Sequence, residues 1–456
     1  MTEISDRPRS ITNGYPLSAP QELWYSGDQG DQAGFFGSGF VLAGAWRITG
    51  RVDVDALRSA LGDVVERHEI LRTVVARDVE RPYQRVHPAC PVPLEVRDVP
   101  LPVGRSREVR AEELLTEAEQ GAVNPRQVPL LRTGLTRFDD TDSVLTLVTH
   151  HTAVDEWAMQ VIIRDLAAFY RARTTGGSAE LPAVHHYREF TAWQQAHTAS
   201  DTARLAREYW RQRMRGARIF AVPTDRPVPD RHTQPYSAHN FVVDTEVMDA
   251  ARAAAAAAET SVEVVLLAAF TVLAHWIAGT TDQAIDTLTT GRIDPRFDDT
   301  VGAVMNFLVF RTELATCESF RDVVASTRDS WDEAHANEIP IQQIEWDVPE
   351  LMEPNEDSSR TQCIIGFFRS PFDLAQLRIA EKSYEIRKRE RLTPVGPWIP
   401  HGVAWALHLV PSGELCACVQ FNREELDEST VVGWTTGYRR ILSNAAQDPD
   451  QRWKAL

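Results

Sequence analysis

The clearest hydrophobic pattern in the chain is an apolar run followed directly by a helical repeat. Residues 144–149 alternate and are rich in β-branched side chains, which predicts a strand. From Asp155 to Tyr170 the apolar positions recur at helical spacing, and Asp155 stands where a helix N-cap belongs. His150 and His151 therefore lie on a short strand-to-helix connection, where rigid elements on both sides can direct side chains into a cleft.

Similar patterns predict further elements and divide the chain into two halves of similar size. Helices are expected over residues 51–72, 247–258 and 262–277. The last of these restarts at a Thr260-Ser261 cap and ends at Gly279. Residues 173–182, rich in Thr, Gly and Ser, are the best candidate for the boundary between the halves.

The composition is that of an ordinary globular protein with an acidic balance. The chain has 456 residues, 25% charged and 43% hydrophobic, so two or three domains are expected and extensive disorder is not. Lys and Arg number 48 against 65 Asp and Glu, and the net charge of −17 disfavours nucleic acid or an anionic membrane as the main partner. The five cysteines are scattered and odd in number, which suggests neither a disulfide framework nor a zinc site.

The apolar segments give no sign of export or membrane insertion. Residues 1–13 are polar and lack the apolar core of a signal peptide. The longest apolar candidate, residues 262–277, is interrupted by Glu263, Thr271 and His275, which predicts a buried helix rather than a membrane span. We therefore expect a cytoplasmic protein.

The adjacent histidines are the main candidate for chemistry. A neutral imidazole is the side chain best suited to handle a proton near pH 7, so the connection after residue 149 is a plausible acyl-transfer site. The alternative is that the pair only decorates the surface or core, and that Asp155 serves only as a cap. A second pair, His185-His186, lacks an aspartate four residues after its second histidine, and we assign it no catalytic role.

The pattern His150-His151-x-x-x-Asp155 resembles the signature of nonribosomal peptide synthetase condensation domains, members of a larger acyltransferase superfamily. Further stretches resemble other motifs of that family, in the family's order. They are 15–21 followed by Leu23-Trp24, 67–73, 129–132, Tyr209-Trp210 with 223–227, Thr290-Gly291-Arg292, and 301–306. One short motif would be weak evidence, whereas six in order are strong.

The resemblance implies an architecture. It is an α/β (α+β) fold of two chloramphenicol-acetyltransferase-like lobes in a V-shaped pseudo-dimer, with an active-site tunnel between them. Residues 1–178 would form the N-terminal lobe with the histidine motif, and residues 179–456 the C-terminal lobe. Segments of the second lobe, near 294–310 and between 367 and 401, would cross back over the first. The same resemblance makes a monomer the expected state.

The resemblance also implies roles for individual side chains. His151 would contact the attacking amine or hydroxyl, either as a general base or as a positioning group. His150 is expected to fix the loop by hydrogen bonding. Asp155 is a poor base at an ordinary pKa near 4 and would instead form an ion pair with Arg292. Trp157 is expected to line the cavity, and Asn306 would either line it or serve a structural hydrogen bond.

Two departures from the family pattern stand out. Glu156 follows the aspartate where the family has glycine, so either the substrate differs or Glu156 turns outward, and we favour the outward orientation. The usual aromatic and glycine motif near the end of the second lobe is absent. Residues 394–402 occupy that region. Their His401 could enter the cavity, but a loop histidine bordered by prolines is expected to face solvent.

The reaction implied by the family needs no bound cofactor and no metal, because a thioester already carries the activation. A donor acyl or aminoacyl group would arrive on the phosphopantetheine of a separate peptidyl carrier protein, and the acceptor would be a small molecule or a second carrier-bound group. Basic residues that would face an acidic carrier occur at 207–218 and 387–391, with a solvated helix face as the alternative. Three hypotheses stay open: a free-standing condensation enzyme forming an amide or ester, a coenzyme A- or polyketide-carrier-dependent O-acyltransferase, and a non-catalytic recruitment domain.

Overall fold

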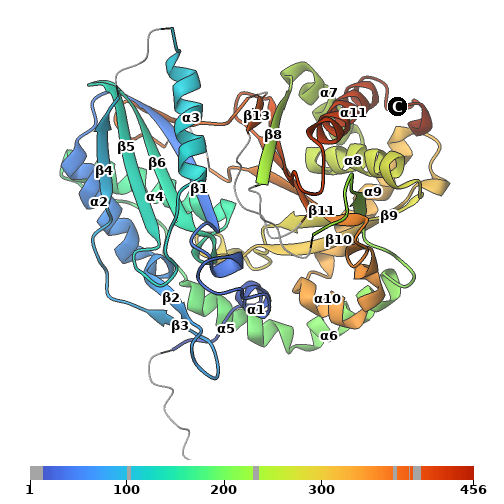
Figure 1. Cartoon of the computed structure of the whole chain (residues 1–456), viewed down its shortest axis with the longest axis horizontal. Helices are drawn as coiled ribbons and strands as arrows, with labels where there is room; N and C mark the ends of the chain where they lie inside the picture. The colour runs from blue at the N-terminus through green and yellow to red at the C-terminus, as the bar shows by residue number, and fades with distance from the viewer. Residues whose placement is uncertain (1–13, 100–103, 230–235, 373–376, 390, 394–401) are drawn as a thin grey trace, which may run out of the picture.

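Two β-sheets, each with its own helices, form the two halves of the molecule (Figure 1). The computed structural model describes residues 14–99, 104–229, 236–372, 377–389, 391–393 and 402–456. The first sheet has the strand order β12 (Lys382–Glu385), β1 (Val41–Thr49), β6 (Asp142–His150), β5 (Leu131–Asp139) and β4 (Leu94–Asp98). A separate hairpin joins β2 (Thr73–Ala76) to β3 (Tyr83–Val86).

The second sheet is larger and mixed. Its order is β10 (Asn306–Glu313), β9 (Asp282–Thr289), β11 (Arg360–Arg369), β14 (Val403–Leu409), β15 (Leu415–Asn422), β8 (Tyr236–Val243) and β13 (Arg391–Thr393). The short β7 (Ala221–Pro223) pairs with β11, which runs parallel to both β9 and β14.

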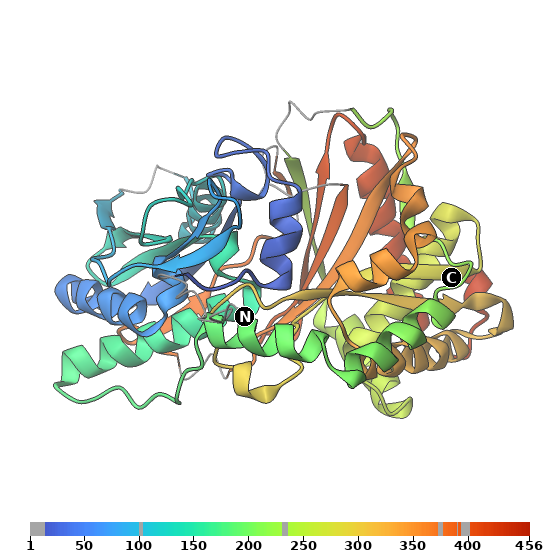
Figure 2. The same cartoon turned by 90° about the horizontal axis from the view of Figure 1, so that it is seen from below.

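Helices cover the first sheet on both faces and surround the junction. In the first half, α2 (Val54–Arg67) and α4 (Glu156–Thr175) pack together, while α3 (Arg107–Glu119) packs on β1 and β6. The short α1 (Ala19–Ser26) stands between the two halves, and α5 (Tyr187–Thr198) and α6 (Asp201–Arg213) run beneath both (Figure 2).

In the part of the chain that the structure describes, helices cover one side of the second sheet. On the side away from the first half lie α7 (Thr245–Ala257), α8 (Val262–Ala278), α9 (Phe320–Ala336) and α11 (Glu428–Gln447) (Figure 1). The short α10 (Ile341–Asp347) packs against α6. The opposite face of the sheet turns toward the first half.

Alternation along the strands gives these two faces different side chains. Large residues such as Ile365, Trp405 and Phe241 join the core under the helices. Their neighbours point the other way, and several of them are small or polar. One row across four strands, fixed by the strand register, is Gly366, Ala406, Cys418 and Asn240. A row of small and polar side chains thus forms part of the face directed at the first half.

Two segments of the second half contribute to the first. Strand β12 pairs antiparallel with β1, with Trp46 opposite Glu385. Phe297, Val301, Val304 and Ile379 are buried in the hydrophobic core of the first half. Both segments fall within the stretches expected to cross back. The domain boundary near residue 178 stays a prediction.

Most predicted elements are present with shifted ends. The helix expected over 51–72 ends at Arg67, and residues 69–72 form a 3-10 turn instead. Gly279 ends α8 in the left-handed conformation with φ 73°, as expected. The apolar helix predicted to be buried is α8, whose residues 264–274 are all buried. Among the described helices none alone meets the length and apolarity of a membrane span, although α7 and α8, bent by 104°, meet them as a pair.

Candidate active site

The histidine motif sits where a central strand ends and a helix begins. Strand β6 closes at His150, and the backbone N–H of His151 donates to the carbonyl of Phe40 at 2.9 Å. Residues 151–153 form one 3-10 turn before Asp155 caps α4, with its Oδ1 accepting from the Ala158 N–H at 2.7 Å. The two histidine side chains are therefore fixed by regular structure on either side.

His150 is buried, and both of its ring nitrogens are engaged in hydrogen bonds. Its Nε2 lies 3.1 Å from the carbonyl oxygen of Gly37, and its Nδ1 lies 2.8 Å from the hydroxyl of Thr152. A carbonyl oxygen can only accept, so Nε2 carries the proton and Nδ1 accepts. Burial lowers the pKa of His150 to about 4, and the ring is neutral at pH 7. This geometry matches the structural role expected for it.

His151 presents one free ring nitrogen. Its Nδ1 donates to the carbonyl of Val154 at 2.8 Å, which places the proton on Nδ1 and leaves the lone pair on Nε2. No hydrogen bond joins Nε2 to another residue that the structure describes. The ring is half-buried. A neutral imidazole in this tautomer can accept a proton from a bound nucleophile.

Aromatic side chains form the walls around His151. Phe40 stacks on the imidazole at 4.7 Å between ring centroids, and Trp24 meets it edge-on at 5.7 Å. Both residues are buried, Phe40 just before β1 and Trp24 on α1. Sequence reasoning missed Phe40 entirely. Trp24 stood within a stretch already recognised as a family motif, which was the one available signal for it.

The environment of His151 sets its protonation. Burial among apolar rings lowers the pKa of His151 below its ordinary value, because the charged ring loses hydration. The carbonyl of Val154 and the negative charges of Asp155 and Glu156 partly offset this by raising the pKa. Burial is the largest influence, so the neutral form prevails at pH 7.

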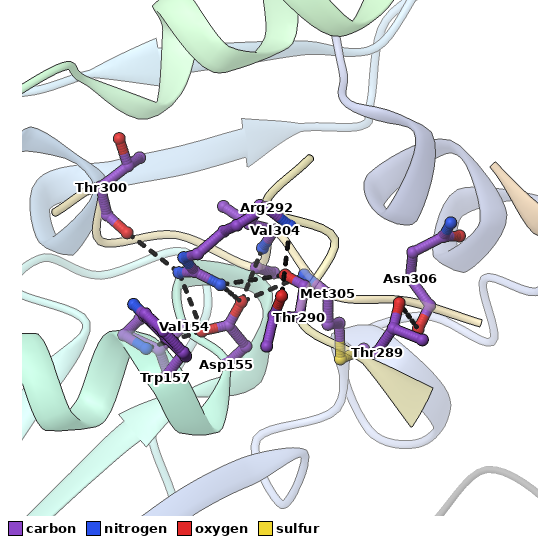
Figure 3. Close-up of polar contacts among 12 residues, drawn as sticks. Val154, Asp155, Trp157, Thr289, Thr290, Arg292, Thr300, Val304, Met305 and Asn306 are labelled. Carbon is purple, nitrogen blue, oxygen red and sulfur yellow. Dashed lines mark hydrogen bonds and ion pairs between the residues drawn. The ribbon is translucent and has the colours of Figure 1, made fainter. Parts of the chain in front are cut away.

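Asp155 and Arg292 form a buried ion pair (Figure 3). Arg292 donates from Nη1 to Oδ2 at 2.9 Å and from Nη2 to Oδ1 at 3.2 Å, and the two side chains are 1% and 5% exposed. The backbone N–H groups of Val304 and Met305 also donate to Oδ2, at 2.9 and 3.1 Å. With these partners and the cap to α4, the carboxylate holds the second-half segment against the histidine loop.

The glycine before Arg292 permits this contact. Gly291 adopts φ 63°, and a β carbon there would lie 2.0 Å from the carbonyl oxygen of Val304. A side chain would push residues 290–292 away from residues 304–305. The stretch Thr290-Gly291-Arg292 therefore meets two requirements of this contact. Gly291 allows the close backbone approach, and Arg292 supplies the positive charge.

Trp157 and Asn306 are both engaged in local contacts. The Trp157 indole donates to the carbonyl of Asp298 at 2.8 Å, and its ring lies 5.4 Å from the Arg292 guanidinium carbon. Asn306 Nδ2 donates to Glu338 at 3.0 Å and to the carbonyl of Ile339 at 2.8 Å, while its Oδ1 accepts from the N–H of Ile341 at 3.2 Å. These contacts favour the structural alternative for Asn306. The cavity-lining role expected for Trp157 stays a prediction.

The outward orientation expected for Glu156 is wrong. Its carboxylate accepts from Arg387 Nη2 at 2.8 Å, and its side chain is 20% exposed. Arg387 lies between β12 and β13, on the segment that connects the two sheets. Glu156 therefore turns toward the junction of the two halves. If it pointed to the surface, the half-buried guanidinium of Arg387 would lose one of its carboxylate partners.

Three further expectations concern surroundings of the motif. The tunnel past His151 stays a prediction: the surface hollows found beside Asp63 and beside Asp139 are not lined by the motif. His401, with residues 394–400, lies outside the described residues. Within the described chain no group of three or more His, Cys, Asp or Glu is arranged to hold a metal ion.

The basic groups expected to face a carrier are largely paired with acids. Arg207 binds Asp347, Arg389 binds Glu414, and Lys388 is buried against Glu119. These cations stabilise the fold locally, and their charge is mostly compensated. These paired cations therefore do not identify a contact surface for a carrier protein.

Comparison with known proteins assigns the family. The condensation-domain family model matches residues 11–456. Phosphinothricin tripeptide synthetase PhsC of Streptomyces viridochromogenes is 33% identical over 335 residues, covering 72% of this chain and 30% of that protein. The probable non-canonical nonribosomal peptide synthetase CymA of Salinispora arenicola is 28% identical, covering 98% of this chain and 6% of that protein. The chain spans less than a third of the length of these curated relatives.

Solved structures share the fold of this chain. SgcC5 from Streptomyces globisporus, solved with (R)-(-)-1-(2-naphthyl)-1,2-ethanediol and sucrose, has a TM-score of 0.90 and 36% identity, covering 96% of this chain and all of that one. The first condensation domain of the calcium-dependent antibiotic synthetase has a TM-score of 0.78 at 19% identity and 98% coverage of this chain and 99% of that one, which shows the fold alone. The predicted two-lobe, chloramphenicol-acetyltransferase-like α/β fold is confirmed. The chain belongs to the condensation-domain family of nonribosomal peptide synthetases.

Proposed function

We propose that this protein is an acyltransferase that moves a carrier-bound aminoacyl or acyl thioester onto an amine or hydroxyl acceptor. The observation that carries the proposal is the tautomer of His151, whose Nδ1 donates to the Val154 carbonyl and whose Nε2 has no partner among the described residues. Members of this family act on substrates tethered to carrier proteins, and that context supports a thioester donor.

The chemistry follows from that free lone pair. An acceptor O–H or N–H placed at Nε2 gives its proton to the ring as its oxygen or nitrogen forms a bond to the thioester carbonyl carbon. The carbon–sulfur bond then breaks, and the proton passes from the ring to the leaving thiolate. The transient imidazolium is stabilised by the Val154 carbonyl and by the charges of Asp155 and Glu156.

A hydroxyl is the first acceptor to test. SgcC5, 36% identical to this chain, was solved with an aryl 1,2-diol, which is a small molecule offering hydroxyl groups and no amine. We infer from that likeness that a free small-molecule alcohol, rather than a second carrier-bound group, is the acceptor here. The product would then be an ester.

The competing hypotheses differ in their donor or in their need for His151. A coenzyme A-dependent O-acyltransferase would accept acyl-coenzyme A as readily as acyl-carrier. A recruitment domain would have no use for a free imidazole nitrogen aimed between aromatic walls.

One experiment separates the three. Product formation from an acyl-carrier and from the matching acyl-coenzyme A is followed by mass spectrometry with a diol acceptor, for wild type and His151→Ala. We expect turnover with the carrier and a loss of about 100-fold or more in His151→Ala, the usual scale for a general base or positioning group. His185→Ala, in the exposed second pair, is the matched control. Unchanged turnover in His151→Ala would contradict the role proposed for His151, whereas a wild type that forms no product from either donor would favour the recruitment domain.

A further inference from the structure

A polar cluster occupies the junction of the two halves beside the histidine motif, and the mechanism above does not use most of it. It is formed by Glu156 and Gln160 on α4, Glu385 at the end of β12, Arg387 on the connection to β13, and His408 on β14. Arg387 Nη2 lies 2.8 Å from Glu156 Oε1 and 2.8 Å from Glu385 Oε1. His408 Nδ1 lies 4.0 Å from Glu156 Oε1.

The charges of this cluster do not balance. Two carboxylates share one guanidinium, and the neighbouring cations Lys388 and Arg389 are bound to Glu119 and Glu414. His408 supplies no positive charge, because burial and the adjacent Arg387 keep its pKa well below the ordinary value. Burial raises the pKa of Glu385, the charge of Arg387 partly offsets that rise, and repulsion from Glu156 adds to it. One more cation at this position would stabilise both carboxylates in their charged form.

Hydrogen-bonding capacity is also left over. Gln160 is 3% exposed, and its Oε1 is buried without a partner within the described chain. His408 Nδ1 is likewise buried without one. Both atoms are acceptors when the imidazole carries its proton on Nε2. A buried acceptor without a donor is unfavourable, so a donor group from a ligand would be favoured here.

The cluster is not sealed. The side chains of Glu156, Glu385, Arg387 and His408 keep between 12% and 23% exposure. Phe368 stacks on His408 at 4.9 Å, and the next positions on β11 and β14 are Gly366 and Ala406, which are paired with each other. The cluster therefore lies next to the row of small and polar residues described above, and its Glu156 directly follows Asp155.

We propose that Glu156 and Glu385, held by Arg387, bind a primary ammonium group carried by the substrate. An ammonium has a positive charge and three donors, which match the excess carboxylate and the acceptors of Gln160 and His408. This deepens the proposed function, on which it rests, by selecting an amine-bearing substrate. The amine is a recognition group at this site and is distinct from the nucleophile at His151.

Binding without turnover tests the proposal. The donor arm uses a non-transferable aminoacyl pantetheine amide and the same compound lacking its amine. The acceptor arm uses an aryl amino alcohol and the corresponding diol. Dissociation constants are measured by calorimetry at pH 7 for wild type, Glu385→Gln and the control Glu414→Gln, which alters the neighbouring exposed ion pair to Arg389.

We expect Glu385→Gln to raise the dissociation constant of the amine-bearing compound in one arm about tenfold. The dissociation constant of its amine-free partner should rise less than twofold. Glu414→Gln should change neither. The arm in which the difference appears identifies whether the ammonium belongs to the donor or the acceptor. Equal weakening of both compounds, or a wild type without preference for the amine in either arm, would overturn the proposal. Glu156→Gln gives the same discrimination should Glu385→Gln fail to fold.

These measurements do not depend on catalysis. His151→Ala should bind the amine-bearing compound as the wild type does while losing turnover. A protein that binds the amine selectively and transfers no acyl group would contradict the proposed function and leave the ammonium site standing.

Discussion

At the scale of single residues, the two adjacent histidines are made different by their hydrogen bonds. His150 has both ring nitrogens occupied, by Gly37 and by Thr152. His151 has one occupied, by Val154. Identical side chains one position apart thus become a loop support and a proton acceptor. The difference arises from backbone carbonyls, which no side-chain motif displays.

The buried neutral state of His150 makes stability depend on pH. Its folded pKa of about 4 is below the ordinary 6.5, so above pH 6.5 it is neutral in both states and contributes no pH dependence. As pH falls from 6.5 toward 4, the unfolded state binds a proton that the folded state does not. The free energy of unfolding should therefore fall by up to about 3 kcal/mol from this residue alone.

Urea denaturation of wild type and His150→Gln at pH 7 and pH 4.5 measures that contribution. Glutamine can still donate to Gly37 and does not titrate. The wild type should lose more stability between the two pH values than the variant does. Parallel losses in the two proteins would show that His150 already titrates normally in the fold.

At the scale of elements, Asp155 ties α4 to a distant segment. It caps the helix and also receives Arg292 and two backbone N–H groups of residues 304–305. The same helix contributes Glu156 to the bridge between the sheets. The first turn of α4 is therefore the point where the histidine loop and both crossing segments meet.

Asp155→Ala should lower the stability of the protein as well as its catalytic activity. The substitution removes the cap and leaves Arg292, 1% exposed, as a buried charge without its carboxylate. We expect a loss of about 3–5 kcal/mol in the free energy of unfolding. Asp450→Ala, which breaks the exposed pair with Arg321, should cost no more than about 1 kcal/mol. Normal stability with full activity in Asp155→Ala would count against the importance of the pairing.

At the scale of the whole molecule, the halves are not independent. The first sheet is completed by β12, and the first core includes Phe297, Val301, Val304 and Ile379 from the second half of the sequence. Apolar burial is the main stabilising contribution in a core, so the first half depends on chain that follows it by more than a hundred residues. A boundary near residue 178 would therefore divide the sequence in two, but side chains from beyond it would still pack in the core of the first half.

Ile379→Ala tests that dependence. Ile379 is 0% exposed in the core of the first half, and its truncation should cost about 2–5 kcal/mol. Hydrogen exchange should accelerate in β1 and β6 more than in β14 and β15. Ile293→Ala, at a side chain 42% exposed, should leave exchange unchanged. Uniform acceleration in both sheets would mean that the two halves unfold as one unit.

Local patterns in the sequence predicted local structure well. The alternation in residues 144–149 correctly predicted strand β6, and the position of Asp155 correctly predicted the N-cap of α4. The contact of Asp155 with Arg292 came from the family resemblance, because no periodicity links residues 137 positions apart. The orientation of Glu156 was wrong for the same physical reason: its partner Arg387 is 231 residues away. Phe40 went unnoticed because a lone aromatic before a strand looks like any core residue.

The pairing of β12 with β1 has a consequence for synthesis on the ribosome. Strands β1, β6 and β5 emerge early, while the strand that covers the outer edge of β1 begins at Lys382, 232 residues after His150. At about 5–20 residues per second, that edge waits roughly 10–50 s for its partner. Unpaired strand edges recruit other chains. Nascent chains of this protein should thus need protection by a chaperone until β12 has been translated.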